Sequence, residues 1–309
     1  MKLSFIIPAL NEEGSLKQLH QEIVKNCASY QYEIIFIDDG SNDSTYPLML
    51  ELADKDSNVK VVKFRKNFGK AYALQVGFER AVGDVIFTMD ADLQDNPIEI
   101  PNFLKKLDEG YELVTGWKVK RRDPLSKRLP SKLFNWVTSK TFKLYLNDYN
   151  CGFKAYSKQL VKELDIYGEM HRYVPALAHA KGFRVGQIPV HHRAREHGKS
   201  KYGVERYLRG FLDLLTVKLI TKYNRSPLYL FGNIGAVFTI IGAVLGAYLT
   251  VMKYGFGMHL TNRPALFLSI LLILVGVQFF SIGLLGELIV NQNRHNNKSK
   301  FISIEKDII

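Results

Sequence analysis

The sequence predicts an α/β protein in which a mostly parallel sheet, flanked by helices, precedes an amphipathic helix and a hairpin of two transmembrane helices. Three observations predict this fold. Short apolar runs alternate with helical periodicity over residues 1–120. Polar clusters follow three of these runs, and two later segments lack charged residues for longer than the ~20 residues that cross a bilayer core.

The predicted strands are residues 3–9, 32–39, 59–64, 84–90 and 112–117. The segments between them suit helices of roughly 10 to 16 residues. Strands that are apolar on both faces and separated by helices indicate a parallel sheet covered on both sides. Ligands of such sheets bind beyond the carboxyl ends of the strands.

Three polar clusters fall at those carboxyl ends, at residues 11–12, 38–41 and 90–92. We expect them to form one site. The third, in "DVIFTMDADLQDNP", places Asp90, Asp92 and Asp95 within six positions, where they repel each other unless a cation or basic groups lie among them. A solvated acidic turn is the alternative for any single Asp, but it explains Asp-Ala-Asp less well, because the preceding strand fixes these carboxylates at the ligand-binding edge of the sheet. Their oxygen atoms suit Mg²⁺ or Mn²⁺, which bind through one or two carboxylates plus substrate phosphates.

The formal net charge of +12 implies an anionic partner, which leaves nucleic acid, a membrane surface and phosphorylated substrates open. The two cysteines are too few for a disulfide framework, so we interpret both as structural, in a reducing compartment. The N-terminus reads as a first strand without a signal cleavage site, which predicts a cytosolic domain.

Residues 203–225 alternate leucines with Arg and Lys, a pattern typical of a helix on a membrane surface. Beyond it, residues 226–252 and 264–286 contain no charged residue. We predict transmembrane helices at about 228–252 and 265–289, and the alternative is a buried hairpin in a soluble protein. The flanking Lys and Arg residues predict that both termini lie in the cytoplasm. Gly242 and Gly246 permit close packing within the hairpin or between protomers, which leaves a homo-oligomer open.

Four stretches resemble the family 2 glycosyltransferases of GT-A fold: "FIIPALNEE", "IIFIDDGSNDST", "NFGKAYALQVGFERAVGDVIFTMDADLQDNP" and "GFKAYS". The most similar branch contains dolichol-phosphate mannosyltransferase and the bacterial undecaprenyl-phosphate glucosyltransferases. The resemblance covers residues 2–202, and the two spans match the bacterial members. It implies a cytosolic catalytic domain at 1–202, an amphipathic helix at 203–225, two transmembrane helices within 226–290 and a basic cytoplasmic tail at 291–309, in a multi-pass protein of the cytoplasmic (inner) membrane.

The resemblance also implies a role for individual residues. The nucleotide-sugar donor would be bound by Pro8, Ala9, Asn11, Glu12, Asp39 and Lys70. The metal ion, Mg²⁺ or Mn²⁺, would be held on the diphosphate by Asp90, Asp92 and Gln94. Phosphates and the lipid carrier would be contacted by Arg122, Arg128, Ser131, Lys132, Arg195, Ser200 and Lys201. Asp148 would lie at the acceptor end, so that the expected catalytic residues are Asp90, Asp92, Asp148, Arg122 and Arg128.

Several of these residues also have a plain structural interpretation. Asn11 and Glu12 suit the start of a helix, and residues 40–43 suit a turn and a helix cap. Lys70 suits a solvated helix position, and Asp148 suits a turn cap. Arg122 and Arg128 suit a membrane surface without specific contacts.

The predicted function is the inverting, metal-dependent transfer of a single sugar from a nucleotide sugar to a polyprenyl phosphate. The expected donor is UDP-glucose, and the expected acceptor is undecaprenyl or another polyprenyl phosphate of the lipid bilayer. A lipid phosphate attacks without prior deprotonation, so no strong general base is required. The sequence has no Q-x-x-R-W segment, the mark of processive family members, and no G-x-G-x-x-G turn after the first strand. The hairpin makes a membrane, and not nucleic acid, the simpler reason for the positive charge. The alternative is a non-catalytic membrane scaffold or regulator that binds nucleotide sugar or lipid phosphate.

Overall fold

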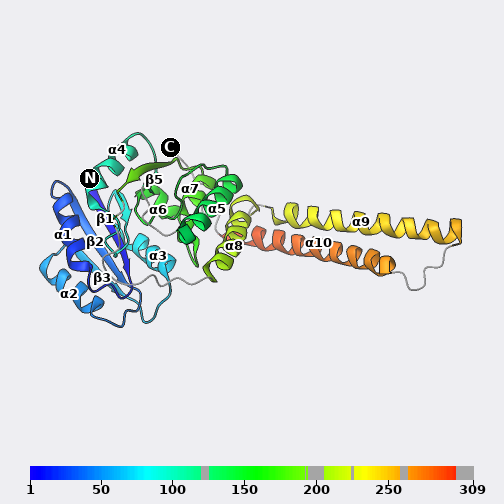
Figure 1. Ribbon diagram of the computed structural model, residues 1–309, viewed down its shortest axis with the longest axis horizontal. Coiled ribbons are helices and arrows are strands. Elements are labelled where there is room, and N and C mark those ends of the chain that lie inside the picture. Colours follow the sequence, from blue (N-terminus) through cyan, green and yellow to red (C-terminus); the bar gives the residue numbers. More distant parts are fainter. Residues whose placement is uncertain (120–124, 192, 194–204, 224–225, 258–263, 297–309) are drawn as a thin grey trace. The chain divides into compact units, whose positions relative to one another are not determined.

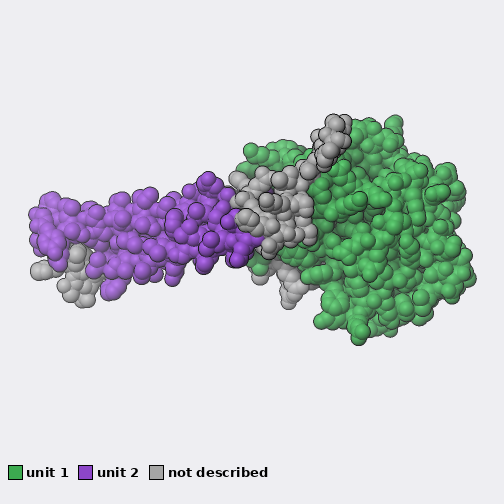
Figure 2. Space-filling model, turned by 180° about the vertical axis from the view of Figure 1, so that it is seen from behind, with its two compact units in different colours: residues 1–217 green, residues 218–309 purple. Residues whose placement is uncertain are grey.

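The computed structural model describes residues 1–119, 125–191, 193, 205–223, 226–257 and 264–296. The chain forms two compact units, residues 1–217 and 218–309 (Figure 2). The domain boundaries expected at residues 202, 225 and 290 stay predictions.

Unit 1 is built on a seven-stranded sheet in the order β3-β2-β1-β4-β6-β5-β7 (Figure 1). The strands are β1 (Lys2–Ala9), β2 (Gln31–Asp38), β3 (Val59–Lys63), β4 (Val85–Thr88), β5 (Leu113–Lys118), β6 (Lys154–Ser157) and β7 (Val185–Val190). β6 runs antiparallel to both of its neighbours, β4 and β5, whereas the other pairs are parallel. The predicted α/β fold with a mostly parallel sheet is confirmed, and β6 and β7 are strands that the apolar runs did not predict.

Helices cover both faces of this sheet (Figure 1). The helices from α1 to α8 are α1 (Leu16–Asn26), α2 (Thr45–Lys55), α3 (Lys70–Arg80), α4 (Ile100–Asp108), α5 (Leu125–Phe142), α6 (Lys158–Glu163), α7 (Val174–Ala180) and α8 (Glu205–Lys218). Single helical turns occur at η1 (Pro97–Glu99), η2 (Met170–Arg172) and the π-helical η3 (Leu219–Tyr223).

The main core lies between the sheet and the apolar faces of α1, α2 and α4. Phe5 and Phe87 stack with their ring centroids 5.1 Å apart, and Phe103 of α4 lies 4.4 Å from Phe153. Burial of each such ring contributes about 1.5–3 kcal/mol, so this aromatic cluster ties α4 to the central strands. On the other face α3 approaches β1 closely, because a Cβ at Gly77 would lie 2.3 Å from Ile6 Cγ2.

The strand order changes direction between β1 and β4, and the carboxyl-end loops on the two sides of this switch point are called the crevice. The chain proceeds from β1 to β2 and β3 on one side, and then crosses to β4 on the other side of β1. Such a switch in direction leaves the loops at the carboxyl ends of the two strands apart, which is where open α/β sheets bind ligands. Since β6 is antiparallel, its amino end meets the same edge.

Unit 2 contains two long helices, α9 (Pro227–Phe256) and α10 (Pro264–Asn296), that lie side by side (Figure 1). Both are long and apolar enough to cross a membrane. Of the most apolar 18-residue stretch of each helix, only 17% in α9 and 11% in α10 is buried. The core helices of a soluble protein would be mostly buried, so this finding favours the predicted membrane hairpin over the soluble alternative.

Small residues bring α9 and α10 together. Ser269 Oγ donates a hydrogen bond of 2.8 Å to the Gly242 carbonyl, and a Cβ at Gly235 would lie 2.6 Å from the Gly276 carbonyl oxygen. A Cβ at Gly246 would lie 2.9 Å from Ser269 Oγ. The Gly242–Gly246 pair is therefore used within the hairpin.

Candidate active site

The loops that follow β1 and β2 are joined by hydrogen bonds. Asn11 N donates to Ser41 Oγ (2.9 Å), and Asn42 N donates to Asn11 Oδ1 (2.9 Å). Glu12 N donates to Thr45 Oγ1 (2.8 Å). Asn11 adopts a left-handed backbone with φ of 52°, which asparagine tolerates better than most residues. The first two predicted polar clusters thus form one surface.

Pro8 and Ala9 are the last residues of β1, and they pair in register with Ile37 and Asp38 of β2. Ala9 is buried, whereas Pro8 is half-buried. Both residues therefore lie at the carboxyl edge of the sheet, directly beneath the joined loops.

Asp38 ends β2 and Asp39 follows it, and both are buried carboxylates, 0% and 5% exposed. Asp39 accepts hydrogen bonds from Phe68 N (2.7 Å) and Gly69 N (3.0 Å), which shape the loop that enters α3. Burial raises the pKa of Asp39, although these two N–H groups oppose the shift and the Asp38 carboxylate adds to it. Asp38 Oδ2 is buried and has no hydrogen-bond partner among the described residues.

Asp90 follows β4 on the other side of the crevice. Its carboxylate forms an ion pair with the ammonium of Lys70, the first residue of α3, and 33% of its side chain is exposed. Burial raises the pKa of Asp90, but the Lys70 ammonium outweighs this effect and holds the pKa well below its usual range. A Cβ at Gly152 would lie 2.5 Å from Asp90 Oδ2, so only glycine leaves room for the carboxylate there.

The turn after Asp90 holds two further carboxylates. Asp92 is 5% exposed and its Oδ1 accepts a hydrogen bond from Gln94 N (3.2 Å). Leu93 is buried with a left-handed φ of 61°, which costs about 1–2 kcal/mol for a residue with a Cβ. Asp95 Oδ2 accepts from Asp90 N (3.3 Å). Strain of this kind gathers at functional sites, where the surrounding fold must impose it.

Asp95 is buried in this turn beside two other carboxylates. Burial raises its pKa to about 6, and the Asp90 and Asp92 carboxylates add to the shift against the opposing ammonium of Lys118. Lys118 Nζ lies 3.9 Å from Asp95 Oδ1. The repulsion expected from the sequence is therefore present, and lysines lie among the carboxylates.

Three basic residues complete this cluster, and the sequence did not predict them as site residues. Lys118 ends β5, Lys154 begins β6 and His171 lies in η2. Lys154 is 3% exposed and donates a hydrogen bond to the Cys151 carbonyl, and burial lowers its pKa, with the Lys70 charge adding to the shift. Burial also lowers the pKa of His171 well below its usual range. The carboxyl-edge rule would have found Lys118, because β5 runs parallel to β4.

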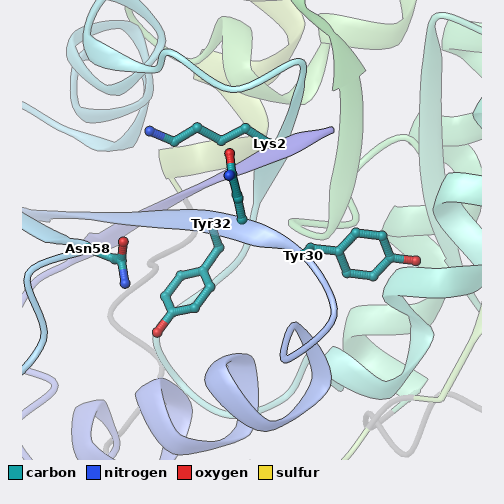
Figure 3. Close-up of a pocket in the computed structure, with 5 residues that line it drawn as sticks. Lys2, Tyr30, Tyr32 and Asn58 are labelled. Atoms are coloured by element: carbon teal, nitrogen blue, oxygen red, sulfur yellow. The ribbon is translucent and has the colours of Figure 1, made fainter.

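Within the described residues, a cavity lies at each end of the sheet. A small one of about 10 Å³, with room for about one water, is lined by Lys70, Leu74, Thr88, Asn150, Cys151, Gly152, Lys154, Tyr156 and His171. A hollow of about 380 Å³ is lined by Lys2, Tyr30, Gln31, Tyr32 and Asn58, at the amino ends of β1, β2 and β3 (Figure 3). None of the predicted site residues lines the larger hollow, so its size does not make it the site.

The remaining predicted residues stay predictions. Asp148 is 1% exposed, and its Oδ1 accepts a hydrogen bond from Asn150 N (3.0 Å), as a turn cap does. Ser131 is half-buried and Lys132 is exposed, both on α5. Outside the described residues lie Arg122, Arg195, Ser200 and Lys201, together with the side chain of Arg128.

The carboxylates suit a hard divalent cation that a phosphate group helps to hold. Among the described residues there is no cluster of three or more His, Cys, Asp or Glu side chains that could hold a metal unaided. Asp90, however, is partly exposed and already binds a cationic group, the Lys70 ammonium. Mg²⁺ and Mn²⁺ need only one or two carboxylates when substrate phosphates and waters fill the other positions. The donor set therefore fits such an ion.

The sequence model described as "Glycosyl transferase family 2" matches residues 4–164, more than half of the chain. The chain belongs to glycosyl transferase family 2. The match includes the joined loops, Lys70, the Asp-Ala-Asp turn and the start of β6. The predicted family is confirmed, and as its member the protein is a glycosyltransferase.

Curated relatives match nearly the whole chain. The dodecaprenyl-phosphate galacturonate synthase of Rhizobium johnstonii is 34% identical over 296 residues, which is 94% of this chain and 88% of the relative. The undecaprenyl-phosphate 4-deoxy-4-formamido-L-arabinose transferase of Klebsiella pneumoniae is 35% identical over 292 residues, 93% of this chain and 88% of the relative. The matched relatives thus bear the names of polyprenyl-phosphate sugar transferases, in agreement with the predicted branch.

Solved structures share the fold. Glucosyl-3-phosphoglycerate synthase from Mycobacterium tuberculosis, in complex with Mn²⁺, uridine diphosphate and phosphoglyceric acid, superimposes with a TM-score of 0.56. The alignment covers 73% of this chain and 81% of the synthase at 20% identity. This likeness, with the strand order, confirms the GT-A architecture of the family 2 domain.

Proposed function

We propose that the protein transfers a single sugar from a nucleotide sugar to undecaprenyl or a related polyprenyl phosphate, with inversion at the anomeric carbon and with the help of Mg²⁺ or Mn²⁺. The observation that carries the proposal is the Asp-Ala-Asp turn at the β1–β4 switch point, where Asp90 is partly exposed and paired with a cationic group. The names of the relatives support the lipid phosphate acceptor. The apolar hairpin supports an acceptor that lies in a membrane.

Different residues of the crevice would bind the nucleoside, the diphosphate and the divalent ion. Asp39 and the joined loops around Asn11 would hold the nucleoside, because their backbone conformation is preset by hydrogen bonds. Lys70 would meet the diphosphate. Asp90, Asp92 and Gln94 would hold the divalent ion, which when bound stabilises the negative charge of the departing diphosphate.

The acceptor needs alignment more than activation. A lipid phosphate is anionic at neutral pH, so its oxygen attacks without a general base. Two anions must nevertheless approach each other, and we propose that Arg122, Arg128, Ser131, Lys132, Arg195, Ser200 and Lys201 offset their repulsion. The buried Asp148, which caps a turn, would support the shape of this end of the site.

We propose a uridine diphosphate sugar as the donor. The glucosyl-3-phosphoglycerate synthase structure, which shares this fold and contains Mn²⁺ and uridine diphosphate, supports a uridine nucleotide and a divalent metal here. UDP-glucose is the first donor to test, and the names of the relatives add a galacturonate donor and a formamido-arabinose donor. We also propose that the hairpin crosses the cytoplasmic membrane with both termini in the cytoplasm, where nucleotide sugars are available.

A transfer assay tests this function. The full chain in lipid nanodiscs is incubated with undecaprenyl phosphate and each labelled nucleotide sugar, with Mg²⁺, with Mn²⁺ or with a chelator. We expect one labelled sugar to enter the lipid fraction, only when acceptor and metal are both present. Binding of nucleotide and lipid phosphate without transfer of any donor would overturn the proposal in favour of the non-catalytic scaffold.

A further inference from the structure

The carboxylate of the candidate metal site already has a cationic partner. Lys70 Nζ pairs with Asp90 Oδ1, and the two side chains are 24% and 33% exposed. An ion pair of this kind competes with any other cation for the same oxygen. A divalent ion can use Asp90 fully only if Lys70 moves away.

Three lysines offset most of the negative charge around Asp90 without a metal ion. The charged groups that interact here are Asp90, Asp92, Asp95 and Asp148 with Lys70, Lys118 and Lys154. A divalent ion that enters alone adds uncompensated positive charge to a partly buried site, which is unfavourable. A diphosphate that enters with it supplies the missing negative charge.

Of the three lysines, Lys70 has the most freedom to move. The Lys154 side chain is buried and donates to the Cys151 carbonyl, and the Lys118 side chain is 13% exposed beside Asp95. Lys70 begins α3, and its ammonium is the group that contacts Asp90. A lysine side chain has several rotatable bonds, so the ammonium can change partners without a shift of the helix.

Lys70 is also joined to the nucleotide side of the crevice. Its preceding residue, Gly69, has φ of 96° and donates its N–H to Asp39, as Phe68 does. The backbone that carries Lys70 is therefore held by the carboxylate proposed to face the nucleoside. Asp39 and Asp90, on opposite sides of the switch point, are connected through Lys70.

We propose that Lys70 is a positioning residue that couples nucleotide binding to metal binding. In the ligand-free protein its ammonium neutralises Asp90. When a nucleoside diphosphate enters, the ammonium exchanges Asp90 for the diphosphate oxygens, and Asp90 becomes available to the divalent ion. This inference rests on the proposed function. Nucleotide and metal then bind with positive coupling, and each raises the affinity for the other by the same factor.

Binding of Mn²⁺ tests the coupling without turnover. Free Mn²⁺ is measured by electron paramagnetic resonance with the full chain in nanodiscs, with and without uridine diphosphate. The variant Lys70→Met removes the competing cation. We expect Mn²⁺ alone to bind about tenfold tighter, and the factor by which uridine diphosphate improves Mn²⁺ affinity to fall about tenfold, within the range usual for coupled sites.

Two further variants separate coupling from general electrostatics. Lys66→Met removes a charge from the same loop, where Lys66 lies over the Phe68 ring 5.2 Å from its centroid and not on Asp90. A general charge effect changes Mn²⁺ affinity equally with and without nucleotide, so we expect Lys66→Met to keep the wild-type coupling factor. Lys70→Arg keeps the charge and is expected to retain most of the coupling.

The outcomes are distinguishable. An unchanged coupling factor in Lys70→Met, with Mn²⁺ and uridine diphosphate still bound, overturns the role of Lys70 and leaves the proposed function standing. A wild-type protein that binds neither Mn²⁺ nor uridine diphosphate overturns the proposed donor site itself.

Discussion

The buried carboxylates at the two edges of the sheet in unit 1 differ in their partners and in their pKa values. At the amino edge, Glu33 is 2% exposed and accepts hydrogen bonds from Ser4 Oγ (2.5 Å), Val82 N (2.8 Å) and Lys60 Nζ (2.7 Å). Burial raises its pKa, but these partners, Lys60 first, outweigh burial and lower it. At the carboxyl edge, burial raises the pKa of Asp39 and of Asp95, whereas the Lys70 ammonium outweighs burial and lowers the pKa of Asp90 between them.

The difference between the edges separates carboxylates that stabilise the fold from carboxylates that are available to bind ligands. A carboxylate with a lowered pKa stabilises the folded state as the anion, whereas one with a raised pKa is held as an anion against its preference. Clustered carboxylates of the second kind lower stability unless a ligand compensates them. The amino edge therefore supports the fold, and the carboxyl edge is prepared for a cation and an anionic substrate.

The largest expected effect is on sugar transfer. Two aspartates that flank β4 at its opposite ends offer a matched pair of variants. Asp92→Asn at the carboxyl edge should lower turnover by about 10³-fold, because the divalent ion proposed to hold the diphosphate would lose a carboxylate ligand. The fold should persist, since the Asn side chain still accepts from Gln94 N. Asp84→Asn, just before the amino end of the same strand, should keep wild-type turnover. Equal turnover in the two variants, measured with labelled donor, would contradict the division between the edges.

The next effect is on stability. Glu33→Gln should destabilise the protein by about 2 kcal/mol, because buried hydrogen bonds lose the charge that strengthened them. The thermal midpoint in nanodiscs should fall by about 5 °C. Transfer at low temperature should stay near wild type. A variant that keeps its midpoint and loses transfer would show that the amino edge is functional after all.

A smaller effect is expected on nucleotide binding. Asp39→Asn keeps one acceptor for Phe68 N but turns an amide donor toward Gly69 N, so the loop before α3 loses its preset shape. Uridine diphosphate should bind about tenfold more weakly by isothermal titration calorimetry. The exposed Asp54→Asn on α2 serves as the control. Unchanged affinity in Asp39→Asn would remove Asp39 from the donor site.

The smallest effect is a pH dependence. The folded-state pKa of Glu33 is lowered, so its stabilisation is present above the unfolded pKa of about 4.3 and is lost as pH falls through the folded value. The difference in thermal midpoint between wild type and Glu33→Gln should therefore be constant near neutral pH and shrink below about pH 4.5. If the difference in thermal midpoint grew as the pH falls, the pKa of Glu33 would be raised and not lowered in the folded protein.

Much of this arrangement was predictable from the sequence. Apolar runs predicted β1 to β5, because strands buried on both faces need such runs. The rule on carboxyl ends then predicted that Asn11, Asp39 and Asp90 share an edge. Two strands were not predicted, because neither has an apolar run. β6 has four residues and begins with Lys154, and β7 contains Gly186 and Pro189.

The parts of the site that were missed depend on contacts between distant segments. The Lys154 charge acts on Asp90 only because β6 inserts between β4 and β5, and the sequence does not show this order of strands. The Lys70–Asp90 pair joins residues twenty positions apart. Nor does the sequence decide whether Gly242 and Gly246 pack within one hairpin or between two chains, since both arrangements use the same motif.

The central claim is that a divalent ion binds at the carboxyl end of β4 together with the donor diphosphate. Anomalous X-ray scattering at the manganese edge, from crystals of the full chain grown with Mn²⁺ and uridine diphosphate, locates the ion directly. We predict a single strong peak between the diphosphate and the carboxylates of Asp90 and Asp92, with the Lys70 ammonium on the diphosphate. A peak elsewhere in the chain, with Lys70 still paired to Asp90 beside bound nucleotide, would contradict the account.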